Sequence, residues 1–259
     1  MPSWLKTTLR LTAIIAVVSI ASFAGLVAFR NVFGVDTIED GDALGSYLQV
    51  LGGIYAVLLA FVVIVVWGQF NDARGFVHRE ANALTDLHRT AAGLPEQARD
   101  VIQQGLCEYV DAVIADEWHA MTCGDHATIE RIGQRLDRVW SAIHTCMPLN
   151  ECQHTVYAEV LARFNDLSET RTNRLSAATA KIPTAMNVLL YTGAVIIVGS
   201  MYLMPFHQFW LHAIVTAALA GAVAHILFLI HDLDTAFAGD YQVDKGPFER
   251  ARKTFARVG

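Results

Sequence analysis

The chain has 259 residues, of which 54% are hydrophobic and 17% charged, and its formal net charge is −6. Most of the hydrophobic excess lies in four runs, so the composition excludes an ordinary soluble domain and indicates a membrane protein. Residues 68–183 carry 11 basic and 16 acidic side chains. This balance argues against nucleic acid as a partner, because that binding depends on clustered Lys and Arg.

Each of the four apolar runs has the length of a membrane span, near the ~20 residues that cross the bilayer core as a helix. None of them contains Asp, Glu, Lys or Arg. Within the first run, Ser22-Phe23-Ala24 resembles a signal-peptide cleavage site, but the apolar stretch continues to Phe29, which favours an uncleaved anchor. The runs are Leu11–Phe29, Tyr47–Trp67, Ala185–Phe206 and Phe209–Ile230.

All but one of the basic residues that flank the spans lie on one side, and this asymmetry predicts orientation. The opposite connections hold Arg30 alone, and the first of them also carries Asp36, Glu39, Asp40 and Asp42. We therefore expect a multi-pass membrane protein with both termini and the central segment cytoplasmic. The basic flanks are Lys6, Arg10, Arg74, Arg79, Arg171, Arg174, Lys181, Lys245, Arg250, Arg252 and Lys253.

The predicted organisation is all-α. Residues 1–67 hold two transmembrane helices, 68–183 a cytoplasmic helical stalk, 184–231 two more transmembrane helices, and 232–259 a cytoplasmic C-terminal tail. The stalk shows helical periodicity throughout and divides into four helices at Gly93-Leu-Pro95, at Thr122-Cys-Gly-Asp125 and at Pro148. Asn150 with Gln153 has the pattern of a capping box at the start of the fourth helix.

The first stalk helix follows the second span without a turn, so we expect one continuous helix. Its apolar seam is expected at three- and four-residue spacings, beginning inside the membrane. The expected seam residues are Trp67, Phe70, Arg74, Val77, Ala81, Leu84 and His88.

Two cysteines and two histidines surround one turn, at His144, Cys146, Cys152 and His154. Such a set of side chains suggests a zinc-binding site as the functional hypothesis. Residues two apart on a helix point about 200° apart, so neither His–Cys pair aims easily at one metal. Reduced structural thiols fit a cytoplasmic segment better, because disulfides need an oxidising compartment.

His212 and His225 lie within the fourth span, where an ionisable group is a functional candidate by default. No carboxylate lies in any span to relay a proton, so a structural role is favoured over a proton-coupled one. After that span, Asp232, Asp234, Asp240 and Asp244 supply hard oxygen ligands suited to calcium, although their spacing is not the calcium-loop pattern and a solvated acidic edge is the alternative.

The sequence carries no Gly-rich phosphate loop, no nucleophile elbow and no catalytic triad in a defining context, so we expect no enzyme. The architecture instead resembles the bestrophins. Bacterial bestrophins show Leu-Gly-Phe-Arg-x-x-x-x-Tyr-x-Arg-Trp-Trp-Glu-Ala-Arg, and this chain reads Leu59-Ala-Phe-Val62 and then Trp67-Gly-Gln-Phe-Asn-Asp-Ala-Arg74.

The sequence is still more similar to a bestrophin-related bacterial membrane family of unassigned function. That likeness extends through Glu80-Ala81, Leu84, Leu87 and Leu94-Pro95, and in the tail through Leu233-Asp234, Phe237 and Gly239. In the tail this chain has Thr235-Ala236 where that family more often has Arg-Pro.

The resemblance implies a homopentameric ion channel whose second span lines an apolar neck. Carried over residue by residue, the neck falls at Gly53, Val57 and Phe61, of which only Phe61 keeps a bulky aromatic ring. Below it, Val62–Val66 replaces positions that are polar in bestrophins, so a pore wall there would be uniformly apolar. In some bestrophins a calcium clasp follows the fourth span, and Asp232–Asp244 occupies the corresponding place without a dense acidic run.

Two functions are thus expected from the sequence. The first is an oligomeric ion channel with span two at the pore and an unassigned permeant ion. The alternative is a non-conducting scaffold or sensor whose stalk recruits a cytoplasmic partner, since Val62–Val66 offers no polar path. In either case we expect Asp72 and Arg74 to anchor the stalk through ion pairs between helices or subunits.

Overall fold

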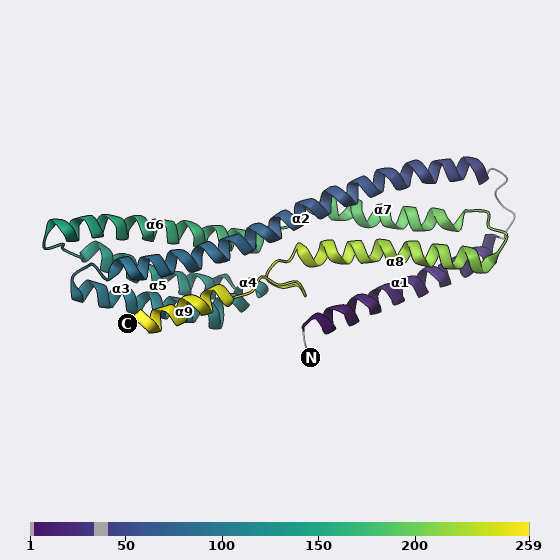
Figure 1. Cartoon of the computed structure of the whole chain (residues 1–259). Helices are drawn as coiled ribbons and strands as arrows, with labels where there is room; N and C mark the ends of the chain where they lie inside the picture. The colour runs from purple at the N-terminus through teal and green to yellow at the C-terminus, as the bar shows by residue number, and fades with distance from the viewer. Residues whose placement is uncertain (1–2, 34–40, 259) are drawn as a thin grey trace. The chain divides into compact units, whose positions relative to one another are not determined.

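The computed structural model of the chain describes residues 3–33 and 41–258, and over these residues it contains helices and no strands (Figure 1). The connection with Asp36, Glu39 and Asp40 lies outside the described residues. The all-helical fold class is confirmed. The elements are α1 (Ser3–Phe33), α2 (Gly41–Ala91), α3 (Glu96–Ala112), the π-helix η1 (Val113–Glu117), α4 (Trp118–Cys123), α5 (His126–Thr145), α6 (Glu151–Thr179), α7 (Thr184–Tyr202), α8 (Phe209–Leu233) and α9 (Gly246–Val258).

The chain divides into two compact units. The first comprises Met1–Gly68 and Lys181–Asp234, and the second comprises Gln69–Ala180 and Thr235–Gly259. Helix α2 is continuous, as predicted, and contributes residues to both units.

Four helical stretches of the described chain are long and apolar enough to cross a membrane, which confirms the four spans expected from hydropathy. All four share low burial inside the chain, between 11% and 39% of the most apolar window, as helices that face lipid or another subunit do. They are Thr7–Phe33, Ala43–Ala91, Glu151–Tyr202 and Phe209–Leu233.

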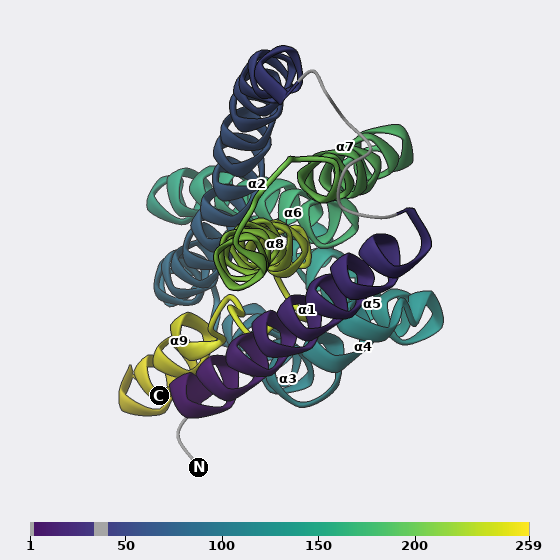
Figure 2. The ribbon, with the colours of Figure 1, turned by 90° about the vertical axis from the view of Figure 1, so that its right-hand side faces the viewer.

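Within the first unit, α8 packs against both α1 and α7 (Figure 2). Small residues let α1 and α8 approach closely, as is usual between membrane helices. A Cβ added at Gly221 of α8 would lie 3.1 Å from the Ile15 side chain and 3.2 Å from Ser19 Oγ. Ser19 Oγ also donates a hydrogen bond of 3.2 Å to the carbonyl of Ala217.

Arg30 of α1 and His212 of α8 are in contact near the loop that connects α7 to α8. Arg30 Nη2 donates to the carbonyl of Phe206 and contacts His212 Nδ1, each at 2.9 Å, while His212 Nε2 lies 2.7 Å from the carbonyl of Met201. Because Arg30 is always a donor, Nδ1 accepts and Nε2 carries the proton. His212 is fully buried and saturated by these contacts, whereas His225 is exposed.

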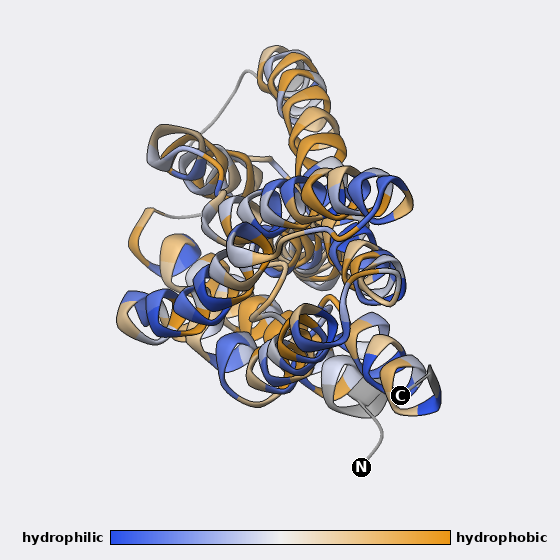
Figure 3. Ribbon diagram, turned by 90° about the vertical axis from the view of Figure 1, so that its left-hand side faces the viewer, coloured by the Kyte–Doolittle hydropathy of each residue, from blue (hydrophilic) through white to orange (hydrophobic). Residues whose placement is uncertain are grey.

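In the second unit, helices begin and end at the turn and capping residues that the sequence analysis identified. Gly124 adopts φ +71°, the left-handed conformation that glycine tolerates best, and ends α4. The Asp125 carboxylate accepts the backbone N–H of Thr128 at 3.1 Å and starts α5. At α6 the Asn150 side chain accepts from Gln153 N at 2.9 Å, so the predicted cap is confirmed. Figure 3 shows hydrophilic and hydrophobic residues mixed along these helices, as amphipathic packing requires.

The expected seam of α2 is wrong at Trp67 and Arg74 and correct at its other positions, among which Phe70 is partly buried against the core. Val77, Ala81, Leu84 and His88 are buried, but Trp67 is 55% exposed and Arg74 is also exposed. Small Ala73 takes the buried position in place of Arg74, because an unpaired guanidinium is too costly to bury.

Glycine substitutions test the packing of α3 on α5. A Cβ at Gly105 would lie 2.6 Å from Cγ2 of Val139, a stiff β-branched side chain, whereas at Gly75 the nearest atom is the end of Arg79 at 3.8 Å. We predict that Gly105→Ala lowers the free energy of unfolding by about 1–3 kcal/mol through overpacking. Gly75→Ala should raise it by up to about 1 kcal/mol through helix propensity. Thermal unfolding in detergent measures both, and equal shifts would contradict this packing.

Candidate functional site

The predicted neck residues share one exposed face of α2. Gly53, Val57 and Phe61 are spaced four residues apart, and the Val57 and Phe61 side chains are 57% and 66% exposed. Gly53 and Val57 also line a shallow apolar depression with Gln49, Val50 and Ile54. The chain itself does not cover this face, so it is available to lipid, to a pore or to another subunit.

The opposite face of α2 packs inside the first unit. Tyr55 Oη donates a hydrogen bond of 2.8 Å to the carbonyl of Leu190 in α7. Its ring fits against Gly193, where an added Cβ would lie 2.6 Å from the ring. Tyr55, Leu59, Val62 and Val66 form the buried stripe. Because these contacts fix the rotation of α2, they also determine which residues stay outside.

The run Val62–Val66 is therefore divided between the two faces. Val62 and Val66 are buried within the unit, while Ile64 and Val65 are 67% and 51% exposed. Only part of this run can reach a pore or a neighbouring helix, and that part is wholly apolar.

The predicted anchor residues Asp72 and Arg74 are both exposed on α2. Among the described residues, neither forms an ion pair within the chain. The ion pairs expected of these two residues stay a prediction.

The predicted calcium ligands are divided between the two units. Asp232 and Asp234 belong to the first unit, and Asp240 and Asp244 to the second. Asp234 Oδ1 accepts the backbone N–H of Ile182 at 2.8 Å, which fixes the chain just before α7. In the described parts of the chain no three His, Cys, Asp or Glu side chains are placed to hold a metal ion. The calcium site stays a prediction.

The same finding applies to the turn between α5 and α6. All four cysteines are free, with Cys146 buried and Cys152 exposed. Burial raises the pKa of the Cys146 thiol. His144, Cys146, Cys152 and His154 are thus not gathered as zinc ligands within the described chain.

Sequence reasoning missed a closed ring of buried charges in the second unit. Arg174 contacts Glu80 at 2.6 Å and Glu117 at 2.7 Å, and its side chain and both carboxylates are fully buried. Arg171 contacts Glu117 at 2.6 Å and donates to Tyr109 Oη at 2.7 Å. Tyr109 Oη donates in turn to Glu80 at 2.6 Å, which closes the ring. These residues come from α2, α3, η1 and α6, so the ring connects four elements.

The ring also sets the protonation states of its members. Burial alone would raise the pKa of Glu117, but the guanidinium groups of Arg174 and Arg171 outweigh it and lower that pKa. Burial and the neighbouring Glu80 raise the pKa of Tyr109 well above its usual value, so the phenol keeps its proton. The pKa of Arg174 rises because Glu80 and Glu117 outweigh the opposing effect of burial. The ring therefore holds two positive and two negative charges.

The π-helix explains how Glu117 reaches this ring. Tyr109, Val113, Glu117 and Met121 are all buried and recur every four residues. That spacing exceeds the 3.6 residues per turn of an α-helix, and the wider turn of η1 keeps such positions on one face. Helix α9 then closes the site, since the ring of Phe248 lies 5.5 Å from the Arg174 guanidinium.

The family model described as a Bestrophin-like domain matches residues 16–248. The chain belongs to the bestrophin-like family. No curated protein matches its sequence, but solved structures match the fold of this bestrophin-like chain closely.

A variant of a bacterial bestrophin homologue from Klebsiella pneumoniae matches with a TM-score of 0.70 and 13% identity, covering 95% of this chain and 99% of its own. The homologue phased with zinc gives a TM-score of 0.69 and 14% identity, over 97% and 98% of the two chains. A further membrane-protein crystal structure gives 0.71 and 14%, over 98% of both. At these identities the likeness establishes the fold alone.

The charge ring can be tested by unbalancing it. Arg174→Leu leaves Glu80 without its cation and Glu117 with only Arg171, and we predict a loss of about 3–5 kcal/mol in the free energy of unfolding. Combining it with Glu80→Leu removes one charge of each sign and should recover most of that loss.

Denaturant titration in detergent, followed by tryptophan fluorescence, measures these changes. Arg163→Leu on the same helix is the matched control, because its ion pair with Glu159 is 40% and 48% exposed and should contribute at most about 1 kcal/mol. A loss for Arg174→Leu no larger than that of Arg163→Leu would show that the ring does not hold this unit together.

Proposed function

We propose that this bestrophin-like protein is the subunit of an oligomeric ion channel of the bacterial inner membrane, with the exposed face of α2 lining the pore. Family membership supports the general function. The observation that carries the pore assignment is the uncovered face of α2 at Gly53, Val57 and Phe61, which the packing of the chain leaves open to a pore.

In this proposal the subunits form a homopentamer, and Val57 and Phe61 meet their counterparts at the narrowest point. An apolar ring of this kind controls conduction by dewetting, without a charged filter. The distribution of Lys and Arg supports a cytoplasmic location for both termini and for the stalk. We propose no enzymatic activity.

The second candidate function is a non-conducting scaffold or sensor. The observation that favours it is the composition of the exposed face between Val50 and Val65, which includes no charged side chain. If that face meets lipid or a neighbouring subunit and encloses no pore, the protein acts through its helical stalk and a cytoplasmic partner.

Ion flux separates these two functions. Liposomes that contain the purified protein should release chloride or potassium. The two ions are assayed separately, and the calcium concentration is varied. We expect Phe61→Ala to change the flux several-fold, because it widens the apolar ring. Ile20→Ala is the matched control, since Ile20 of α1 is 67% exposed, close to the 66% of Phe61. Absence of flux under every condition, from protein shown to be folded and oligomeric, would favour the scaffold.

A separate test concerns Asp72 and Arg74, which we propose form ion pairs between subunits. Reversing both charges, with Asp72→Lys and Arg74→Glu, leaves the internal packing of each unit intact because both side chains are exposed. Each single reversal should weaken the oligomer, and the double reversal should restore it if the two residues pair with each other across the interface. Oligomer mass by light scattering measures the effect, and unchanged mass in all three variants would remove the anchor role.

A further inference from the structure

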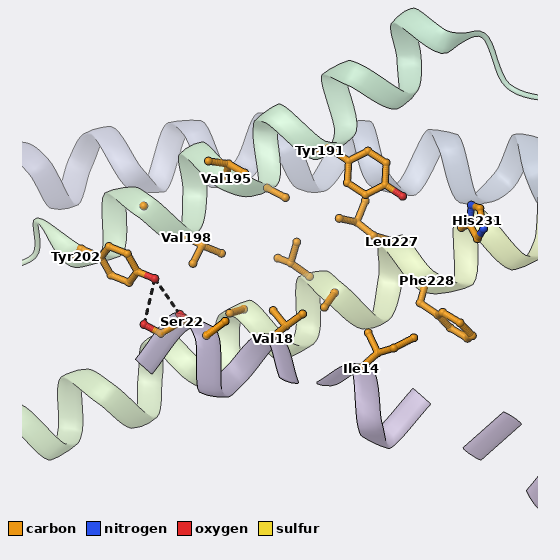
Figure 4. A pocket seen from close by; sticks show the side chains of 16 residues that line it. Ile14, Val18, Ser22, Tyr191, Val195, Val198, Tyr202, Leu227, Phe228 and His231 are labelled. Atoms are coloured by element: carbon orange, nitrogen blue, oxygen red, sulfur yellow. Dashed lines mark hydrogen bonds between the residues drawn. The ribbon is translucent and has the colours of Figure 1, made fainter. Parts of the chain in front are cut away.

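Two cavities of the described chain differ in chemical character. In the first unit, an apolar cavity of about 650 Å³ lies among α1, α7 and α8, beside the hydrogen bond of 3.1 Å from Tyr202 Oη to the carbonyl of Ser22 (Figure 4). In the second unit, a pocket of about 410 Å³ lies between α2 and α9, and most of the side chains that line it are polar. Volumes of this size are typical of small-molecule sites. The charged groups of the second pocket also indicate which molecule it selects.

Small buried residues form the floor of the pocket between α2 and α9. Ala81 of α2 and Pro247 and Ala251 of α9 line it and are buried. On the same two helices, the rings of His88 and Phe255 stack with their centroids 4.2 Å apart and their planes 10° apart, which holds α9 against α2. Because the floor side chains are short, the longer side chains around them enclose an open space. The pocket is therefore part of the packed fold of this unit.

Two guanidinium groups line the pocket from different helices. Arg89 belongs to α2 and Arg250 to α9, and both residues are exposed. In the part of the chain that the structure describes, neither forms an ion pair, although Arg250 Nη1 and the Asp244 carboxylate both lie close to Gly246. Two cations and one carboxylate, Asp86, thus line the pocket, which leaves one net positive charge when histidine is neutral. A positive pocket in a chain of net charge −6 concentrates anions.

The chemistry of these groups indicates the class of ligand. Guanidinium groups bind phosphate oxygens through paired, charge-assisted hydrogen bonds, and two of them on different helices can hold one phosphate between them. The carboxylate of Asp86 can only accept, so it needs a donor such as a hydroxyl group on the ligand. None of the described residues that line the pocket is Phe, Tyr or Trp, and a nucleobase would lack the aromatic ring on which bases stack. The lining therefore suits a phosphorylated sugar better than a nucleotide.

The position of the pocket along α2 favours a soluble ligand over a lipid headgroup. Helix α2 is continuous from the second apolar run, which ends at Trp67, through Arg89, and about 33 Å of helix separates these two residues. The headgroup region of a bilayer adds only about 5–8 Å on each side of the hydrocarbon core.

We propose that the pocket between α2 and α9 binds a small soluble sugar phosphate. Arg89 and Arg250 hold the phosphate, and a sugar hydroxyl donates to Asp86. The site lies in the second unit and is independent of the pore assignment, so it holds whether or not the protein conducts ions.

Isothermal titration calorimetry of the full-length protein in phosphatidylcholine nanodiscs tests the site, with glucose 6-phosphate as the probe. Arg89→Gln and Arg250→Gln should each weaken binding by at least about ten-fold, because each removes charge-assisted hydrogen bonds. Both residues are exposed, so the melting temperature should not change. Arg252→Gln is the matched control on α9, because Arg252 points about 200° away from Arg250 and pairs with Asp111 at 3.6 Å outside the pocket.

Two further variants test the pocket independently. Asn82 lines it and is exposed, so Asn82→Trp should block binding without unfolding the protein. Asp86→Asn should weaken the binding of glucose 6-phosphate, because the hydroxyl loses its charged acceptor. The same change should strengthen the binding of inorganic phosphate, because a like charge is removed. These opposite signs are expected only if Asp86 contacts the sugar beside the phosphate.

No binding of glucose 6-phosphate or inorganic phosphate by the wild type at millimolar concentration would overturn the site. So would equal losses for Arg250→Gln and Arg252→Gln. Tighter binding of AMP than of glucose 6-phosphate would overturn the assignment of the ligand class. Displacement of glucose 6-phosphate by phosphatidylglycerol added to the nanodiscs would assign the pocket to a lipid headgroup and overturn the soluble ligand.

Discussion

The second unit depends on the buried charge of Arg174. A guanidinium with no exposed surface is tolerable only if carboxylates neutralise it and hydrogen bonds satisfy its donors. Glu80 and Glu117 meet that need from α2 and η1, and Tyr109 and Arg171 complete the ring. Sliding or rotating any one of these helices would leave a buried charge without its ion-pair partner. The ring therefore fixes the mutual register of the helices more strictly than apolar contacts alone.

In the first unit the corresponding constraint is the rotation of α2. The hydrogen bond from Tyr55 to Leu190, and the seating of its ring on Gly193, hold one face inward. The outward face, with Val57 and Phe61, then follows from helical geometry. The candidate pore surface is thus the face of α2 that does not pack inside the unit. Its apolar character suits a hydrophobic gate and suits a protein contact equally.

Features that depend on local sequence were predictable. Hydropathy located the four spans, and Gly124, Asp125 and Asn150 marked helix ends because caps and left-handed turns are decided by a few neighbouring residues. The neck positions came from a family resemblance, and the structure places them on an exposed face of α2.

Features that depend on pairing between distant residues were not predictable. Arg171 and Arg174 counted as flanking charges, although they continue the apolar stripe of α6 after Val160, Phe164 and Leu167, and that spacing was the available signal. Glu117 reaches the core through a π-turn that no local pattern announced. Helix α9 adds Phe248, Ala251 and Phe255 to the core of the second unit, a contribution that its apolar spacing indicates only once its partners are known.

Cysteine accessibility along α2 tests the central claim most directly. In a cysteine-free background reconstituted in liposomes, single cysteines at Gly53, Val57 and Phe61 are compared with cysteines at the inward positions Leu59 and Val62. If the exposed face of α2 lines a pore, a charged thiol reagent added in water modifies the first set and alters ion flux, and leaves the second set unmodified. Protection of Gly53, Val57 and Phe61 from the aqueous reagent, with flux unchanged, would contradict the account.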